Sequence, residues 1–261
     1  MNIQVLVATM HQPGGDYSLL NKMNIRSDAI VCNQCDRNEI EGFAWNGHRI
    51  KWLSLAERGV GLNRNNALMR ADGDVCLFAD DDMRYNDDYV QTVEKGFEEY
   101  PDADVLVFNL TEKEVTRKII RKPGRVRFWN FLRYGTARVA VRTEAVRGNG
   151  IYFNQCFGGG TEHCHGEDNL FLAACLQKGL KIYAVPAFIA ELTDERPSSW
   201  NVGYDEKYLR DQGVLYRTMA RRFWKLLCLQ DALRRQRAYR RSWMESYRIM
   251  TEKGPEGINS K

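Results

Sequence analysis

The chain of 261 residues has no long hydrophobic run and no regular cysteine framework. No apolar segment approaches the ~18 residues that a membrane-spanning helix needs, so no such span is expected. The start, Met1 to Thr9, lacks the basic flank and the apolar length of a signal peptide, which predicts a cytoplasmic protein. The seven cysteines are odd in number and irregularly spaced, and apolar contexts such as those of Cys76 and Cys175 predict buried, reduced thiols. A disulfide scaffold is thereby excluded.

The composition is that of a soluble globular protein, with 44% hydrophobic and 28% charged residues. This length predicts one domain of catalytic size plus an appendage. The net charge of +4 is small, but ten Lys or Arg stand against Asp231 and Glu245 between Arg217 and Arg248. The asymmetry indicates an acidic partner for this tail.

Apolar runs alternate along the chain with amphipathic segments. Strands are expected at residues 3–8, 29–31, 50–53, 75–79, 103–110, 138–141 and 181–185, and helices at 61–70, 89–100 and 169–178. This alternation predicts an α/β protein whose largely parallel sheet carries helices on both faces. The basic segment 111–135 is irregular and receives no role, whereas the chain from Asp205 onward is predicted to be mainly helical.

The most informative feature is the run Asp80, Asp81 and Asp82, which directly follows the apolar strand 75–79. Ligands of open α/β sheets bind at the carboxyl ends of strands. Three adjacent acids repel one another, so something positive is expected beside them, and Mg²⁺ or Mn²⁺ bridging carboxylates to a substrate's phosphates is the natural candidate. The alternative is that these acids cap the following helix.

Two further motifs accompany the acids: ERGVGLNRNNAL at residues 57–68, and Gly-Glu-Asp-Asn at 166–169 opening a helix. In this order they resemble the family 2 glycosyltransferases of GT-A fold. The resemblance covers about residues 1–204 and implies a Rossmann-like domain there, with a nucleotide-sugar half at about 1–110 and an acceptor half at about 111–204. Residues 205–261 are then a basic, amphipathic helical tail.

The resemblance implies roles on the donor side. As the last acid of the motif, Asp82 would bind Mn²⁺ or Mg²⁺ on the diphosphate; Asp80 would meet the ribose or the metal, and Asp81 would support them. Thr9, at the end of the first strand, and Arg64, in the second motif, would contact the nucleotide. A surface helix arginine is the alternative for Arg64.

The family's acidic pair after the second strand is not reproduced cleanly here. The stretch Val31 to Asp36 offers Asn33, Gln34 and Asp36 instead, and amides can hydrogen-bond uracil. The identity of the base therefore stays open. The same stretch contains a lone Cys-x-x-Cys without a second pair, so a zinc or redox role is disfavoured.

On the acceptor side the resemblance makes Asp168 the general base of an inverting reaction and Glu167 an orienting group. Gly159, Gly160 and Trp200 are the acceptor-site candidates, although a core tryptophan is an equal alternative for Trp200. His163 and His165 stand two residues apart, which does not match the usual spacing of zinc ligands. A histidine there would instead touch the sugar or the metal.

Together these features predict a metal-dependent glycosyltransferase that moves a sugar from a nucleotide-diphosphate donor, by preference a UDP-sugar, to a hydroxyl of a glycan or lipid-linked acceptor. The alternatives are a sugar nucleotidyltransferase and a non-catalytic protein whose basic tail binds nucleic acid. The tail, with apolar and basic residues interleaved between Tyr216 and Tyr247, is predicted either to lie on an anionic membrane surface or to pack on the catalytic domain.

Overall fold

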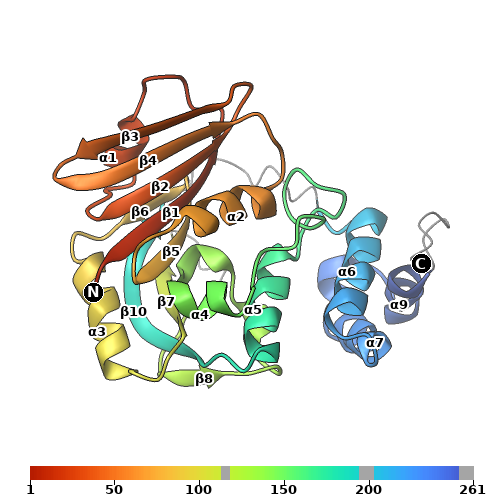
Figure 1. The fold of residues 1–261 in the computed structure, drawn as a ribbon. Helices are drawn as coiled ribbons and strands as arrows, with labels where there is room; N and C mark the ends of the chain where they lie inside the picture. Colours follow the sequence, from red (N-terminus) through yellow and green to blue (C-terminus); the bar gives the residue numbers. More distant parts are fainter. Residues whose placement is uncertain (113–117, 194–202, 253–261) are drawn as a thin grey trace.

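The computed structural model describes residues 1–112, 118–193 and 203–252. Its centre is a ten-stranded sheet in the order β3-β4-β2-β1-β5-β9-β7-β10-β6, with β8 paired to β10 (Figure 1). The strands are β1 (Ile3–Met10), β2 (Asp28–Gln34), β3 (Glu39–Trp45), β4 (His48–Leu55), β5 (Val75–Asp80), β6 (Met83–Tyr85), β7 (Val105–Thr111), β8 (Gly124–Val126), β9 (Val139–Arg142) and β10 (Ile182–Leu192).

The expected largely parallel sheet is confirmed. Strands β4, β2, β1 and β5 are parallel neighbours, and β7 and β10 run in the same direction, because β9 is antiparallel to both β5 and β7. Three strands were not expected from the sequence. β3 forms an antiparallel hairpin with β4, while β6 and β8 pair antiparallel with β10.

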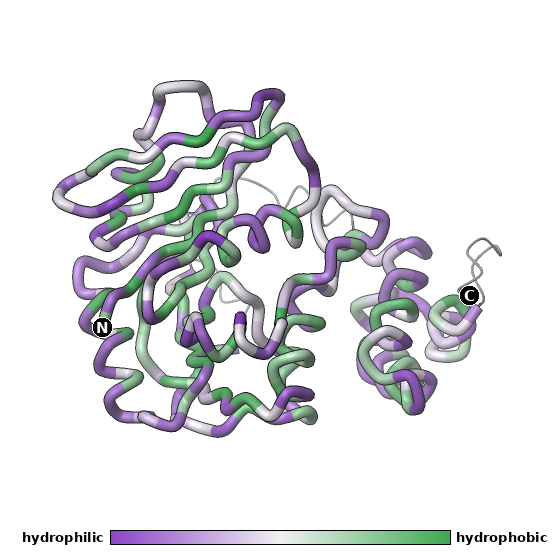
Figure 2. The backbone as a smooth tube through the Cα atoms, viewed as in Figure 1, coloured by the Kyte–Doolittle hydropathy of each residue, from purple (hydrophilic) through white to green (hydrophobic). Residues whose placement is uncertain are grey.

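Alternation along the central strands divides the core into two apolar layers. In β5, Val75, Leu77 and Ala79 point to one face, whereas Cys76 and Phe78 point to the other. Helices α1 (Ser18–Lys22) and α3 (Tyr89–Glu99) cover the first face, and α2 (Val60–Arg70), α4 (Thr143–Gly148) and α5 (Glu167–Gln177) cover the second. Figure 2 shows hydrophobic residues concentrated along the central strands.

The last helices form a separate unit beside α5 (Figure 1). They are α6 (Glu206–Met219), α7 (Trp224–Arg234), α8 (Gln236–Tyr239) and α9 (Trp243–Thr251), and we call residues 206–251 the helical unit. Its own core contains Leu209, Tyr216, Cys228, Tyr239, Ile249 and Met250. At Gly213, α6 approaches α9 so closely that an added Cβ would lie 1.9 Å from the Met250 carbonyl oxygen, and only glycine fits.

Candidate active site

Polar residues gather where β1 and β5 end, at the carboxyl edge of the sheet. Thr9 is buried and donates its hydroxyl hydrogen to Asp81 Oδ2 at 2.6 Å. The Asp82 carbonyl oxygen accepts hydrogen bonds from the backbone N–H and the hydroxyl of Thr193, each at 2.8 Å. The donor-side acids are thus fixed by the first strand and by the segment after β10.

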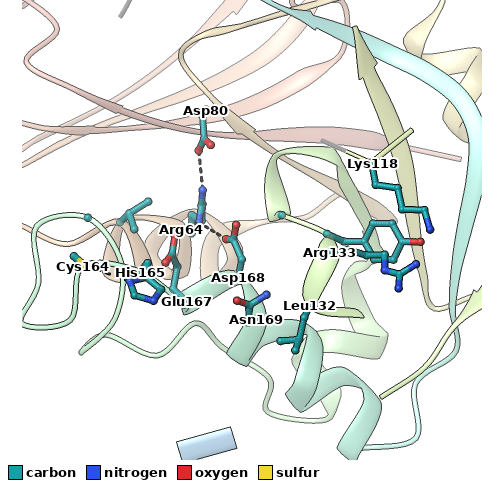
Figure 3. A pocket seen from close by; sticks show the side chains of 15 residues that line it. Arg64, Asp80, Lys118, Leu132, Arg133, Cys164, His165, Glu167, Asp168 and Asn169 are labelled. Carbon is teal, nitrogen blue, oxygen red and sulfur yellow. Dashed lines mark hydrogen bonds and ion pairs between the residues drawn. The ribbon is translucent and has the colours of Figure 1, made fainter. Parts of the chain in front are cut away.

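Arg64, from α2, joins the two acidic motifs (Figure 3). One guanidinium nitrogen lies 2.8 Å from Asp80 Oδ1, and the other lies 2.9 Å from Asp168 Oδ1 and 3.2 Å from Glu167 Oε1. Burial alone would lower the pKa of Arg64, but the three carboxylates outweigh burial and raise this pKa, so the side chain is permanently charged. The surface alternative for Arg64 is wrong, because its side chain is only 5% exposed.

Asp168 lies in the first turn of α5, where the helix dipole favours a negative charge. Besides Arg64, its carboxylate accepts hydrogen bonds from the hydroxyl and the backbone N–H of Thr136, the latter at 3.1 Å. Thr136 begins the short 3₁₀ helix η2 (Thr136–Arg138) and is fully buried. Asp168 is therefore held from two sides while 28% of its side chain stays exposed to the pocket.

Glu167 is more enclosed than Asp168. Burial, followed by the negative charge of Asp168, raises the pKa of Glu167 above its ordinary value, with Arg64 opposing the shift. Residues 157–161, which we call the glycine loop, pack directly on it. Gly158 has φ of +97°, and a Cβ there would lie 2.7 Å from the Glu167 carboxyl carbon. The neighbouring Gly159 carbonyl accepts from the Val60 N–H at 3.0 Å, which attaches this loop to the start of α2.

The residues expected to read the base are engaged inside the protein. Asn33 is fully buried and bonds the backbone N–H and carbonyl of Gln12 at 3.0 and 3.1 Å. Gln34 accepts from the Gly59 N–H at 3.1 Å, while Asp36 is exposed. Contact of Asn33 or Gln34 with a nucleobase stays a prediction, and it requires these internal bonds to be exchanged.

The loop that leads into α5 rests on α6 of the helical unit. His163 Nδ1 lies 3.0 Å from Asp211 Oδ1, and the Cys164 N–H donates to Asp211 Oδ2 at 3.0 Å. His165 Nε2 lies 2.7 Å from Gln212 Oε1. Both histidines therefore dock the loop onto α6.

Some of these residues line a cavity of about 610 Å³. Its walls include Asp80, Arg64, Glu167 and Asp168, which places the two acidic motifs around one space. Gly159 lines this cavity, whereas Gly160 is exposed on the loop beside it. Trp200 falls outside the described residues.

Sequence reasoning missed Thr136 and Asp211, which hold the acceptor-side loop. Thr136 directly follows the irregular segment 111–135, and its partner Asp168 is 32 residues away. Asp211 is on α6, 47 or 48 residues from its loop partners. No local sequence pattern marks either residue as part of the site. Gly213, a glycine within α6, does indicate close packing nearby.

The donor-side acids offer part of the ligand set that a divalent ion needs. Asp80 is 38% exposed and Asp82 is exposed, and both offer hard carboxylate oxygens. The expected mutual repulsion of the acids is already partly relieved by Arg64 at Asp80 and by Thr9 at Asp81. One or two carboxylates completed by substrate phosphates is the usual arrangement for Mg²⁺.

Within the described residues, one group of three candidate ligands has its ligand atoms all within 4.8 Å, namely Cys164, His165 and Asp211. Burial raises the pKa of the Cys164 thiol to about 11, and Asp211 is already ion-paired to Lys207 at 2.7 Å. The three residues already make hydrogen bonds with one another, with Lys207 and with Gln212, so the group joins the loop to α6.

Comparison with known proteins decides the family. The profile of "Glycosyl transferase family 2" matches residues 17–154. The chain belongs to glycosyltransferase family 2. Among curated protein sequences, none matches this chain.

Solved structures agree on the fold. The chain is similar to Staphylococcus aureus TarS 1-349 in complex with UDP-GlcNAc, with a TM-score of 0.65 and 17% identity over 96% of this chain and 90% of that one. It is also similar to the mannosyltransferase PcManGT from Pyrobaculum calidifontis in complex with GDP-Man and Mn²⁺, with a TM-score of 0.54 and 13% identity over 84% and 64% of the two chains.

These findings confirm the family 2 resemblance and the GT-A fold, and they identify the chain as a glycosyltransferase. The nucleotidyltransferase and the nucleic-acid-binding alternatives are set aside accordingly. In the described ranges, no helix is both long and apolar enough to cross a membrane.

Proposed function

We propose that this glycosyltransferase transfers a sugar, with inversion at the anomeric carbon, from a UDP-sugar to a hydroxyl of a glycan or lipid-linked acceptor. The observation that supports this most is Arg64, which brings Asp80 and Asp168 to one cavity. A single displacement needs the donor's leaving group and the acceptor's base on two sides of one reacting carbon. In Figure 3 Asp80 and Asp168 contact different terminal nitrogens of the Arg64 guanidinium.

Asp168 is the proposed general base. It is partly exposed to the cavity, and Thr136 and Arg64 fix its orientation, so one oxygen can face an acceptor hydroxyl. A positioned base contributes about 10²–10⁴-fold to a rate. Glu167, packed beneath the glycine loop at the wall of the cavity, orients this end of the pocket.

On the donor side, Asp82 and Asp80 would hold Mn²⁺ or Mg²⁺. When bound, the ion would neutralise the charge that develops on the leaving diphosphate. A solved neighbour carries Mn²⁺ and others carry UDP or UDP-GlcNAc, which supports a metal and a UDP-sugar without choosing the sugar. Thr9, Arg64 and Asp81 would form the remaining wall around the nucleotide.

The decisive experiment compares wild type with Asp168→Asn. We expect the variant to bind UDP normally but to turn over about 10²-fold more slowly or worse, because an amide cannot accept the proton. NMR of the wild-type product should show the anomeric configuration opposite to that of the donor. Retention of configuration, or near wild-type turnover by the variant, would contradict the assignment. A screen of UDP-, GDP- and TDP-sugars by thermal shift, with and without Mn²⁺, identifies the donor.

We also propose that α7 attaches the enzyme to an anionic membrane surface. Two of the apolar residues expected there, Trp224 and Leu227, pack against the helical unit's core. Phe223 and Leu226, however, are each 63% exposed and Leu233 is 48% exposed. These three recur at spacings of three and seven residues and so share one helical face, next to several arginines.

Liposome flotation tests this attachment. Truncation within α6 would remove the support of the active-site loop, so the informative change is the double variant Phe223→Ser and Leu226→Ser. We expect wild type to bind anionic but not neutral vesicles, and the double variant to lose that binding. Met69→Ser, at a 49% exposed position on α2, is the matched control. Absence of binding by wild type at low salt would exclude the attachment.

A further inference from the structure

The active-site cavity has a basic edge to which the proposed transfer step gives no role. Besides the acidic centre, its walls include Lys118 and Arg133. Both side chains are exposed, and neither makes an ion pair or a side-chain hydrogen bond within the part of the chain that the structure describes. Figure 3 shows them together at one end of the cavity, with Asp168 between them and the Cys164–His165 end.

A buried arginine holds this edge in place. Arg138 is only 2% exposed and donates to the backbone carbonyl oxygens of Lys118 at 3.3 Å and Arg133 at 2.9 Å. Its guanidinium also lies 5.1 Å from the centre of the Tyr134 ring. Two cationic residues 15 positions apart are therefore fixed on the same wall, although like charges repel.

The other cation of the cavity is already committed. Arg64 contacts three carboxylates, so its charge is balanced inside the protein. Lys118 and Arg133 leave about two positive charges facing the cavity. A neutral sugar hydroxyl needs neither of them, whereas a phosphate carries close to two negative charges and several acceptor oxygens. Guanidinium and ammonium groups are the usual partners of phosphate.

We propose that Lys118 and Arg133 bind a phosphate group of the acceptor, so that the substrate hydroxyl reaches Asp168 while its phosphate lies at the basic edge. This deepens the proposed function and rests on it. The phosphate belongs either to a lipid headgroup or to a soluble phosphate-containing polymer. Lys118 and Arg133 are thereby specificity residues, and Arg138 positions them through their backbone.

The test measures binding to enzyme that is first saturated with UDP and Mn²⁺, so that the donor site is occupied. The probe is glycerol 3-phosphate, with glycerol as the neutral comparison, in calorimetric titrations. We expect wild type to bind the phosphate probe only, and Lys118→Ala and Arg133→Ala each to weaken binding about 5- to 10-fold. Binding should also weaken as salt rises, because both cations are exposed.

Matched controls are Lys95→Ala on α3 and Arg222→Ala before α7, both exposed and remote from the cavity, which should leave phosphate binding unchanged. UDP affinity, measured in the same variants, separates the hypotheses. Normal UDP binding with no phosphate binding in wild type overturns this inference alone, whereas failure of wild type to bind UDP contradicts the proposed donor. If Arg133→Ala weakens UDP binding as much as it weakens phosphate binding, the pair binds the donor diphosphate. This result also overturns the inference.

Two larger probes then distinguish the phosphate's source: soluble poly(glycerol phosphate), and a polyprenyl diphosphate in neutral phosphatidylcholine vesicles. Binding of one of them that is lost in the Lys118→Ala and Arg133→Ala double variant identifies the acceptor class. Binding of both that the double variant leaves unchanged contradicts the inference.

Discussion

On the donor side of the cavity Thr9 and Asp80 lie at the carboxyl ends of buried strands, whereas on the acceptor side the functional side chains are held by elements far away in the sequence. Thr9 is the last residue but one of β1 and Asp80 is the last residue of β5, and the strands themselves set their positions. Asp168, by contrast, depends on Thr136, and its loop depends on Asp211 of the helical unit. The comparison indicates that the donor side is a property of the sheet, while the acceptor side is assembled by tertiary packing.

The largest expected effect lies on the donor side. Asp82→Ala should lower transfer by about 10²–10³-fold or more, because the leaving diphosphate loses electrostatic stabilisation. Nucleotide binding should lose its dependence on Mn²⁺, while circular dichroism shows an unchanged fold. Asp88→Ala, at an exposed position in the following loop, is the control that should retain activity. Full transfer in saturating EDTA would refute this role.

A smaller effect is expected on the acceptor side from Thr136→Val, which keeps the shape but removes one hydrogen bond to Asp168. A hydrogen bond to a charged group contributes about 1.5–3 kcal/mol, so kcat should fall about 10-fold or more while the KM for the donor stays constant. Thr136→Ser restores the hydroxyl and should rescue kcat. A rise in donor KM, or failure of the serine to rescue kcat, would contradict this role of Thr136.

The smallest effect concerns stability and pH at Glu167. Its pKa in the folded protein is raised by burial, so above the ordinary value near 4.3 the folded state binds more protons than the unfolded state. The free energy of unfolding should therefore fall as pH rises between that value and the raised one, by at most about 1.4 kcal/mol per pH unit. Glu167→Gln should make the decline of Tm shallower, and Glu162→Gln, at an exposed position in the same loop, should not.

The sheet could be read from the sequence where burial imposes a clear pattern. The strand before Asp80 is apolar on both faces, and the acids after it mark its end. β3 was missed because none of its residues is buried, so no apolar alternation distinguishes it. β10 was expected to stop before Pro186 but continues to Leu192, since register shifts between Ala184 and Ala190 accommodate the proline.

The residues of the candidate site also divide into those that a sequence pattern reveals and those that it does not. Asp80 and Asp168 were found because each adjoins an element that the sequence reveals, and the structure brings both to Arg64. Arg138 and Thr136 were missed because their partners are backbone carbonyls and a carboxylate that only the folded chain brings near. Contacts of this kind leave no periodic trace in the sequence.

The contact between Gly213 and Met250 also has a consequence for biosynthesis. A ribosome releases residues 1–204 well before residues 243–251, so the sheet and its donor-side acids can form while α6 still lacks α9 as a partner. The loop carrying His163 and Cys164 gains its hydrogen bonds to Asp211 only after α6 has formed. We expect a nascent chain to become competent for nucleotide binding during translation, and to become competent for transfer only after α9 has emerged.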